Sequence, residues 1–104
     1  MIRATLTMKV KAGREHDFER AWRAIADHTS RVPGNLRQAL LSKQDEPGVF
    51  VITSDWEDRE AFGRFERSEE QDILTAPLRA LRETGSMSIS TLITHIDSQS
   101  TCVE

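Results

Sequence analysis

Apolar and polar residues alternate strictly at the start of the chain. Five apolar residues occupy every second position: Ile2, Ala4, Leu6, Met8 and Val10. This period of two predicts a strand with one buried face over residues 2–10, and the glycine-containing stretch at residues 11–13 predicts a turn after it.

The period then becomes helical. Between residues 14 and 29, apolar residues recur three and four positions apart: Phe18, Ala21, Trp22, Ile25 and Ala26. This spacing predicts an amphipathic helix that lies over a sheet and ends before Pro33-Gly34. Two apolar segments follow at residues 36–43 and 49–55. The Asp45-Glu46-Pro47-Gly48 turn between them predicts a hairpin.

Helix signals return after Trp56. Asp58 predicts an N-cap for a helix that turns Phe62 and Phe65 inward. Ser68 with Gln71 three residues later resembles a capping box, so a new turn is expected there.

The last third of the chain contains another proline. Thr75-Ala76-Pro77 predicts a further helix start, because proline fits the first turn of a helix better than its interior. Gly85 predicts the end of that helix, and residues 86–96, rich in Ser, Thr and Ile, predict a fourth strand.

The predicted order is β-α-β-β-α-β. Right-handed crossovers joined by a hairpin give an α+β, ferredoxin-like fold, in which helices cover one face of a four-stranded antiparallel sheet. With 104 residues, we expect one domain over residues 1–97 and a polar tail over residues 98–104.

The two central apolar segments predict burial on both faces of the sheet. Residues 39–41 and 49–52 are apolar in succession, which is unusual for strands with one face in water. Helices cover only one face, so we expect a second copy of the chain to cover the other in a C2 homodimer. The alternative is a monomer with an open apolar face.

Composition excludes several classes of partner. The net charge is −3, and basic residues are interleaved with acidic ones, so no basic face for nucleic acid is expected. No apolar run approaches the roughly 18 residues that span a bilayer, and the N-terminus has no signal pattern. One cysteine, Cys102, forms no internal disulfide, which suits a reducing cytoplasm.

The chain has three histidines and no tyrosine as candidate acids or bases near neutral pH. His16 lies among charges and is expected on the surface. His28 is placed near a helix C-terminus, and His95 is placed on the fourth strand, facing a cavity or a dimer seam. Their spacing does not bring them together, so no metal site is expected.

Three segments together resemble the antibiotic biosynthesis monooxygenase (ABM) family of dimeric α/β barrels. They are the first strand ending in Lys11-Ala12-Gly13, the Val32-Pro33-Gly34 turn, and Ser54-Asp55-Trp56-Glu57-Asp58 leading into Ala61-Phe62. The resemblance covers residues 2–96. Residues 75–81 and the Arg- and Ala-rich composition are similar to members that accompany aromatic polyketide pathways in actinobacteria.

The resemblance implies a cavity between the sheet and its helices. By strand parity, Phe50, Ile52, Ser54 and Trp56 share one face. If that face meets the helices, its lining consists of these residues together with Leu6, Met8, Trp22, Phe62 and Phe65. Such an aromatic pocket suits a flat polycyclic ligand. The alternative for Trp56 is a packing anchor at the corner between strand and helix.

Several family members oxidise anthrone-type phenols to quinones without metal or flavin, since an electron-rich phenolate can itself pass an electron to oxygen. The chain resembles them at Trp56, but they carry an asparagine four residues earlier, where this sequence has Ile52. The haem-degrading branch fits worse. The positions of its asparagine, tryptophan and histidine hold Leu6, Phe65 and Thr75 in this chain.

The resemblance therefore implies a monooxygenase-like protein that oxidises an aromatic polyketide, an anthrone or quinol, with no cofactor. Trp56 would shape the pocket, and His95 or His28 would assist proton transfer. Ile52 and Leu6 favour the alternative of a polyketide cyclase or a non-catalytic partner that holds an intermediate. The expected partners are a second copy, an aromatic polyketide-like molecule and other enzymes of such a pathway. A general small-molecule-binding or stress protein is a third reading.

Overall fold

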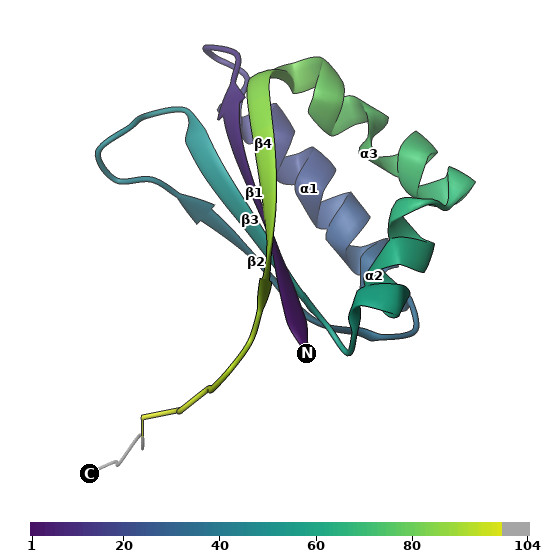
Figure 1. Ribbon diagram of the computed structural model, residues 1–104. Helices are drawn as coiled ribbons and strands as arrows, with labels where there is room; N and C mark the ends of the chain where they lie inside the picture. The colour runs from purple at the N-terminus through teal and green to yellow at the C-terminus, as the bar shows by residue number, and fades with distance from the viewer. Residues whose placement is uncertain (99–104) are drawn as a thin grey trace, which may run out of the picture.

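Four strands form one antiparallel sheet, and three helices cover one of its faces (Figure 1). The computed structural model describes residues 1–98; the predicted tail beyond residue 98 and Cys102 lie outside this range. The elements are β1 (Ile2–Val10), α1 (Glu15–Thr29), β2 (Asn35–Ser42), β3 (Val49–Trp56), α2 (Arg59–Glu66), α3 (Glu69–Leu81) and β4 (Arg82–Thr91). The strand order β2-β3-β1-β4 is that of the predicted ferredoxin-like fold.

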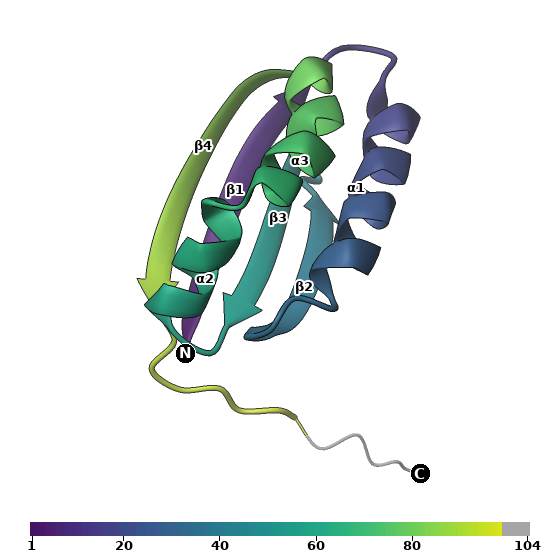
Figure 2. The same cartoon turned by 90° about the vertical axis from the view of Figure 1, so that its right-hand side faces the viewer.

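Two layers are clear when the molecule is seen from the side (Figure 2). All neighbouring strands pair antiparallel, with Leu6 opposite both Ile52 of β3 and Met87 of β4. No helix within residues 1–98 is long and apolar enough to cross a bilayer.

Both predicted caps of the second helical region are present. The Asp58 side chain accepts a hydrogen bond from the Ala61 N–H at 2.8 Å, and Ser68 accepts one from the Gln71 N–H at 3.1 Å. Ser68 starts a separate helix, so the predicted single helix is two consecutive helices, α2 and α3.

The prediction of a helix start at Thr75 is wrong. Pro77 lies inside α3, on its exposed side, where the missing N–H leaves a backbone carbonyl that water can reach. Thr75 Oγ1 donates to the Gln71 carbonyl one turn earlier instead of capping a new helix.

The predicted boundaries of the last strand are also wrong. β4 follows α3 directly at Arg82, so Gly85 lies inside the strand opposite Met8 and does not end a helix. The strand ends at Thr91, and His95 lies in the segment after it. Pairing with β1 sets both limits, because β1 supplies partners only from Ile2 to Val10.

The Pro33-Gly34 turn fixes the approach of α2 to the sheet. Gly34 has a φ of +92°, which favours glycine, and a Cβ at this position would lie 2.5 Å from Ala61 Cβ. Only glycine therefore allows the turn to pack directly against α2.

The face of the sheet that lacks helices carries a buried ion pair. Asp55, whose side chain is 2% exposed, accepts hydrogen bonds from Arg3 Nε at 2.7 Å and Arg3 Nη2 at 3.0 Å. Arg37 Nε lies 3.5 Å from the same carboxylate. The hydrogen bonds from Arg3, aided by the charges of Arg3, Arg37 and His95, hold the pKa of Asp55 below its usual value despite burial.

Candidate functional site

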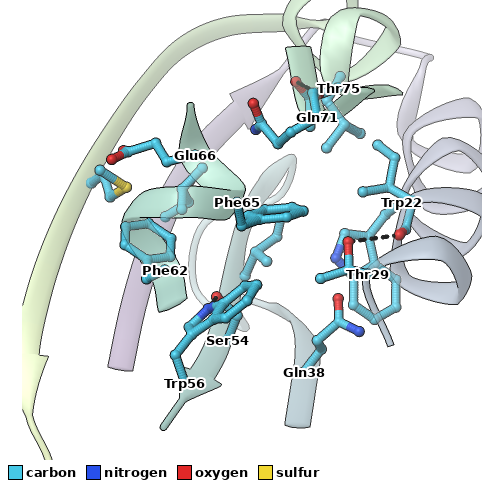
Figure 3. A pocket seen from close by; sticks show the side chains of 15 residues that line it. Trp22, Thr29, Gln38, Ser54, Trp56, Phe62, Phe65, Glu66, Gln71 and Thr75 are labelled. Carbon is cyan, nitrogen blue, oxygen red and sulfur yellow. Dashed lines mark hydrogen bonds between the residues drawn. The ribbon is translucent and has the colours of Figure 1, made fainter. Parts of the chain in front are cut away.

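A cavity lies between β1, β3 and the helices (Figure 3). Its walls are mainly apolar and aromatic, with a few polar side chains. The residues that line it are Leu6, Trp22, Ile25, Thr29, Gln38, Ile52, Ser54, Trp56, Phe62, Phe65, Glu66, Gln71, Thr75, Leu78 and Met87. Strand parity turns Leu6, Ile52, Ser54 and Trp56 towards the helices, as the sequence predicts.

Trp56 is both a packing residue and a wall of this cavity. Its side chain is fully buried at the end of β3. Its ring lies 5.6 Å from that of Phe62, edge to face, and 4.9 Å from that of Phe65, centroid to centroid. Trp56 Nε1 donates to Ser54 Oγ at 3.0 Å, which fixes the indole and satisfies its polar group.

Two residues predicted for the lining lie outside it. Met8 and Phe50 face the helices, but they pack in the core with Phe18, whose ring stacks on Phe50 at 5.0 Å. The side chain of Phe18 fills the space beside them, so the cavity ends at Leu6 and Ile52. Parity gives the correct face for Met8 and Phe50, but it does not show where along a strand the hollow stops.

Neither of the two candidate histidines lines the cavity. His28 Nε2 lies 3.4 Å from Glu70 Oε2 and bridges α1 and α3 on the outer side, beside Phe65. His95 is exposed beyond β4, with Nε2 2.7 Å from Asp97 Oδ1. Glu66, at the rim, is the ionisable side chain of the lining. Among residues 1–98, no three His, Cys, Asp or Glu side chains gather as a metal site would require.

The sequence analysis missed Gln38 and Thr29. Gln38 is opposite Ser54 in the β2–β3 pairing and therefore faces the helices. Its Nε2 donates to the Ala26 carbonyl at 3.0 Å. Thr29, 3% exposed, donates from Oγ1 to the Ile25 carbonyl at 2.9 Å. A polar residue at a helix-facing position of β2 was the available signal.

The cavity volume is about 120 Å³. Pockets for drug-sized ligands are typically about 300–1,000 Å³, whereas a dry cavity of about 150 Å³ holds benzene. The cavity therefore matches a single ring, and a tricyclic molecule enters only if side chains at the rim move. Phe65 and Trp22 are half-buried and lie at this rim.

Known proteins match both the sequence and the fold. Protein SchA from Streptomyces halstedii and the 42.8 kDa protein in the whiE locus of Streptomyces coelicolor are each 29% identical over 92 residues, 88% of this chain. The chain spans about a quarter of their length, 24% and 23% respectively.

SnoaB, a cofactor-independent oxygenase from Streptomyces nogalater, superposes with a TM-score of 0.83 at 25% identity. The superposition covers 93% of this chain and 97% of SnoaB. The pattern of the antibiotic biosynthesis monooxygenase family matches residues 1–72. This match, together with the shared fold, shows that the chain belongs to the antibiotic biosynthesis monooxygenase family.

Proposed function

We propose that the chain oxidises an aromatic polyketide, an anthrone or quinol, to a quinone with molecular oxygen and no cofactor. The observation that carries this proposal is the aromatic cavity with Trp56 at its wall. The likeness to SnoaB, a cofactor-independent oxygenase, supports the reaction type. The relative in the whiE locus and SchA direct the proposal towards actinobacterial pathways of the kind that the resemblance implies.

In this reaction an anthrone CH₂ and O₂ give a C=O and one water. One oxygen atom enters the product and the other leaves as water, so no external reductant is needed. The electrons come from the substrate once it is deprotonated. The protein's part is to bind the ring system, remove a proton and exclude bulk water.

The proposed roles follow from placement. Trp56, Phe62 and Phe65 contact the aromatic ring system. Glu66, at the rim, is better placed than the two candidate histidines to accept a proton, because His28 and His95 lie outside the lining. Leu6 and Ile52 contribute apolar surface. A three-ring substrate requires Phe65 or Trp22 to swing outward, because the cavity measures about 120 Å³.

A second candidate function is a cyclase or a non-catalytic carrier of a polyketide intermediate. Its supporting observation is the apolar pair Leu6 and Ile52, which lie opposite each other at the centre of the cavity. An apolar surface can orient a flexible chain without hydrogen-bonding a phenol.

Oxygen uptake with a purified anthrone separates the two. The oxygenase proposal expects uptake above the autoxidation rate, without added metal or flavin, and a quinone product that carries label from ¹⁸O₂. Heat-unfolded protein serves as the control. Uptake equal to that control would reject the oxygenase reading, and a cyclised product formed without oxygen consumption would favour the second function.

We also propose that the chain forms a homodimer through the sheet face that lacks helices. Leu41, which is 49% exposed there, and the half-buried Val51 beside it give this face apolar character in a single chain. Sedimentation at micromolar concentration is expected to give twice the mass of the chain. A monomer across the whole concentration range would contradict the dimer.

A further inference from the structure

The cavity holds two polar groups on neighbouring strands whose hydrogen-bonding capacity is not used up within the protein. Gln38 of β2 and Ser54 of β3 are directly opposite in the strand pairing and both face the helices. Figure 3 shows them at the same end of the cavity, below the rings of Phe65 and Trp22.

The orientation of the Gln38 amide is determined by its partner. The Ala26 carbonyl only accepts hydrogen bonds, so the group 3.0 Å from it must be the Gln38 NH₂. The amide oxygen then occupies the other branch. In Figure 3 this oxygen points into the cavity, while the nitrogen is turned towards α1. Gln38 therefore presents a fixed acceptor.

Ser54 presents the complementary group. Its oxygen already accepts the Trp56 indole N–H at 3.0 Å. Among residues 1–98, the Ser54 hydroxyl hydrogen has no acceptor within hydrogen-bonding distance, so it is available as a donor. Thr29 Oγ1, which donates to the Ile25 carbonyl, adds a second acceptor on the α1 side.

We infer that Gln38 and Ser54 form a binding site for one aromatic hydroxyl group. The ligand O–H donates to Gln38 Oε1, and the ligand oxygen accepts from the Ser54 hydroxyl. A phenol is suited to this pair because its hydroxyl both donates and accepts, whereas a methyl ether only accepts. This inference rests on the proposed function for the assumption that the ligand is aromatic, and it assigns the residues that select its hydroxyl.

The inference also accounts for Ile52. An amide at that position would bring a hydrogen-bonding group to β3, where this chain has an apolar side chain. Here the amide lies on β2 instead, near Ile52, because Gln38 and Leu40 are helix-facing neighbours and Leu40 pairs with Ile52. The ligand hydroxyl is therefore held at the Trp56 end of the cavity.

The test uses phenol, anisole and toluene, single-ring probes that match the cavity volume. The two indole N–H resonances of the chain, from Trp22 and Trp56, report binding in ¹H–¹⁵N spectra. We expect the native protein to bind phenol about tenfold more tightly than anisole, the effect of one net hydrogen bond of about 1.4 kcal/mol. Gln38→Met, which keeps the length of the side chain, is expected to reduce this ratio to about one.

The control is Gln44→Met, the same substitution at an exposed turn position, which should keep the tenfold ratio. Gln38→Met is expected to fold, because the Ala26 carbonyl retains its bond from the Ser30 N–H at 2.9 Å. Should that variant unfold, the native protein alone decides. Phenol must then shift the Trp56 indole resonance more than toluene does, since it bonds to the Ser54 hydroxyl.

Equal affinities of the native protein for phenol and anisole would overturn the inference and leave the proposed function intact. A preference that survives in Gln38→Met, or equal shifts from phenol and toluene, would overturn it in the same way. Absence of saturable binding for all three probes would reject the inference and the aromatic-ligand proposal together.

Discussion

The space between the sheet and the helices has two ends, built from the same strands but packed differently. At the packed end, Met8 and Phe50 surround the fully buried Phe18. At the hollow end, two residues further along each strand, Leu6 and Ile52 line an open cavity. A shift of two positions keeps the face of the strand and changes the role of the side chain from filling to lining.

The helices explain the difference. At the packed end, α1 inserts an aromatic ring that stacks on Phe50 at 5.0 Å. At the hollow end, the rings of Phe62 and Phe65 from α2 lie against Trp56 and not against the centre of the sheet. The aromatic rings therefore form a wall around a space that no side chain fills, which is what a ligand site requires.

Phe18→Ala should have the largest effect. Removing a fully buried ring that stacks on Phe50 leaves a void that the strands cannot close, and we expect the free energy of unfolding to fall by about 4 kcal/mol. Urea denaturation measures this. A loss below about 1 kcal/mol would mean that the packed end is as loosely filled as the hollow end.

Asp55→Asn tests the opposite face of the sheet. Because Arg3 and Arg37 are partly exposed, we expect a loss of about 2 kcal/mol, less than for a fully buried pair. The folded-state pKa of Asp55 is lowered, so its contribution is present above the unfolded pKa and is lost as pH falls through the folded value. The stabilities of native protein and variant should converge below about pH 4.

Probe binding in the cavity should not change in Asp55→Asn, since the carboxylate lies on the other side of the sheet. If the stability difference instead stayed constant down to acid pH, the ion pair would not be the source of the stabilisation.

Ile52→Asn asks whether the hollow end can accept a polar group. Replacing this buried side chain should cost about 1.5 kcal/mol, because apolar burial is lost while the new amide can reach water in the cavity. Under the proposed oxygenase function, we expect faster anthrone-dependent oxygen uptake, since the amide can hydrogen-bond a phenolate. Leu40→Asn on the neighbouring strand is the matched control. Unchanged uptake in Ile52→Asn would argue for the cyclase or carrier reading.

Phe65→Ala is the counterpart of Phe18→Ala and should have the smallest effect on stability, about 1 kcal/mol. Phe65 is half-buried, and its ring contacts Trp56 on one side only. Opening the rim should increase the affinity for a three-ring ligand by several-fold, as measured by equilibrium dialysis. Weaker binding of that ligand would show that Phe65 is a contact surface and not a gate.

The sequence by itself determines which side chains face the helices. Alternation in residues 2–10 and 49–56 places Leu6, Ile52, Ser54 and Trp56 on one face, because the strand period of two is a local property of the backbone. The caps at Asp58 and Ser68 are equally local, since each side chain bonds to an N–H three residues later. The ferredoxin-like order of elements follows from these periods and turns.

Only the tertiary structure decides where the cavity begins and what it offers a ligand. Met8 and Phe50 share their faces with lining residues, yet Phe18 from α1 fills the space beside them. Gln38 becomes a fixed acceptor only because the Ala26 carbonyl of α1 lies 3.0 Å away. Pro77 is tolerated within α3 because that side of the helix is exposed. Each of these depends on how a helix sits on the sheet, which is set by contacts between residues far apart in the chain.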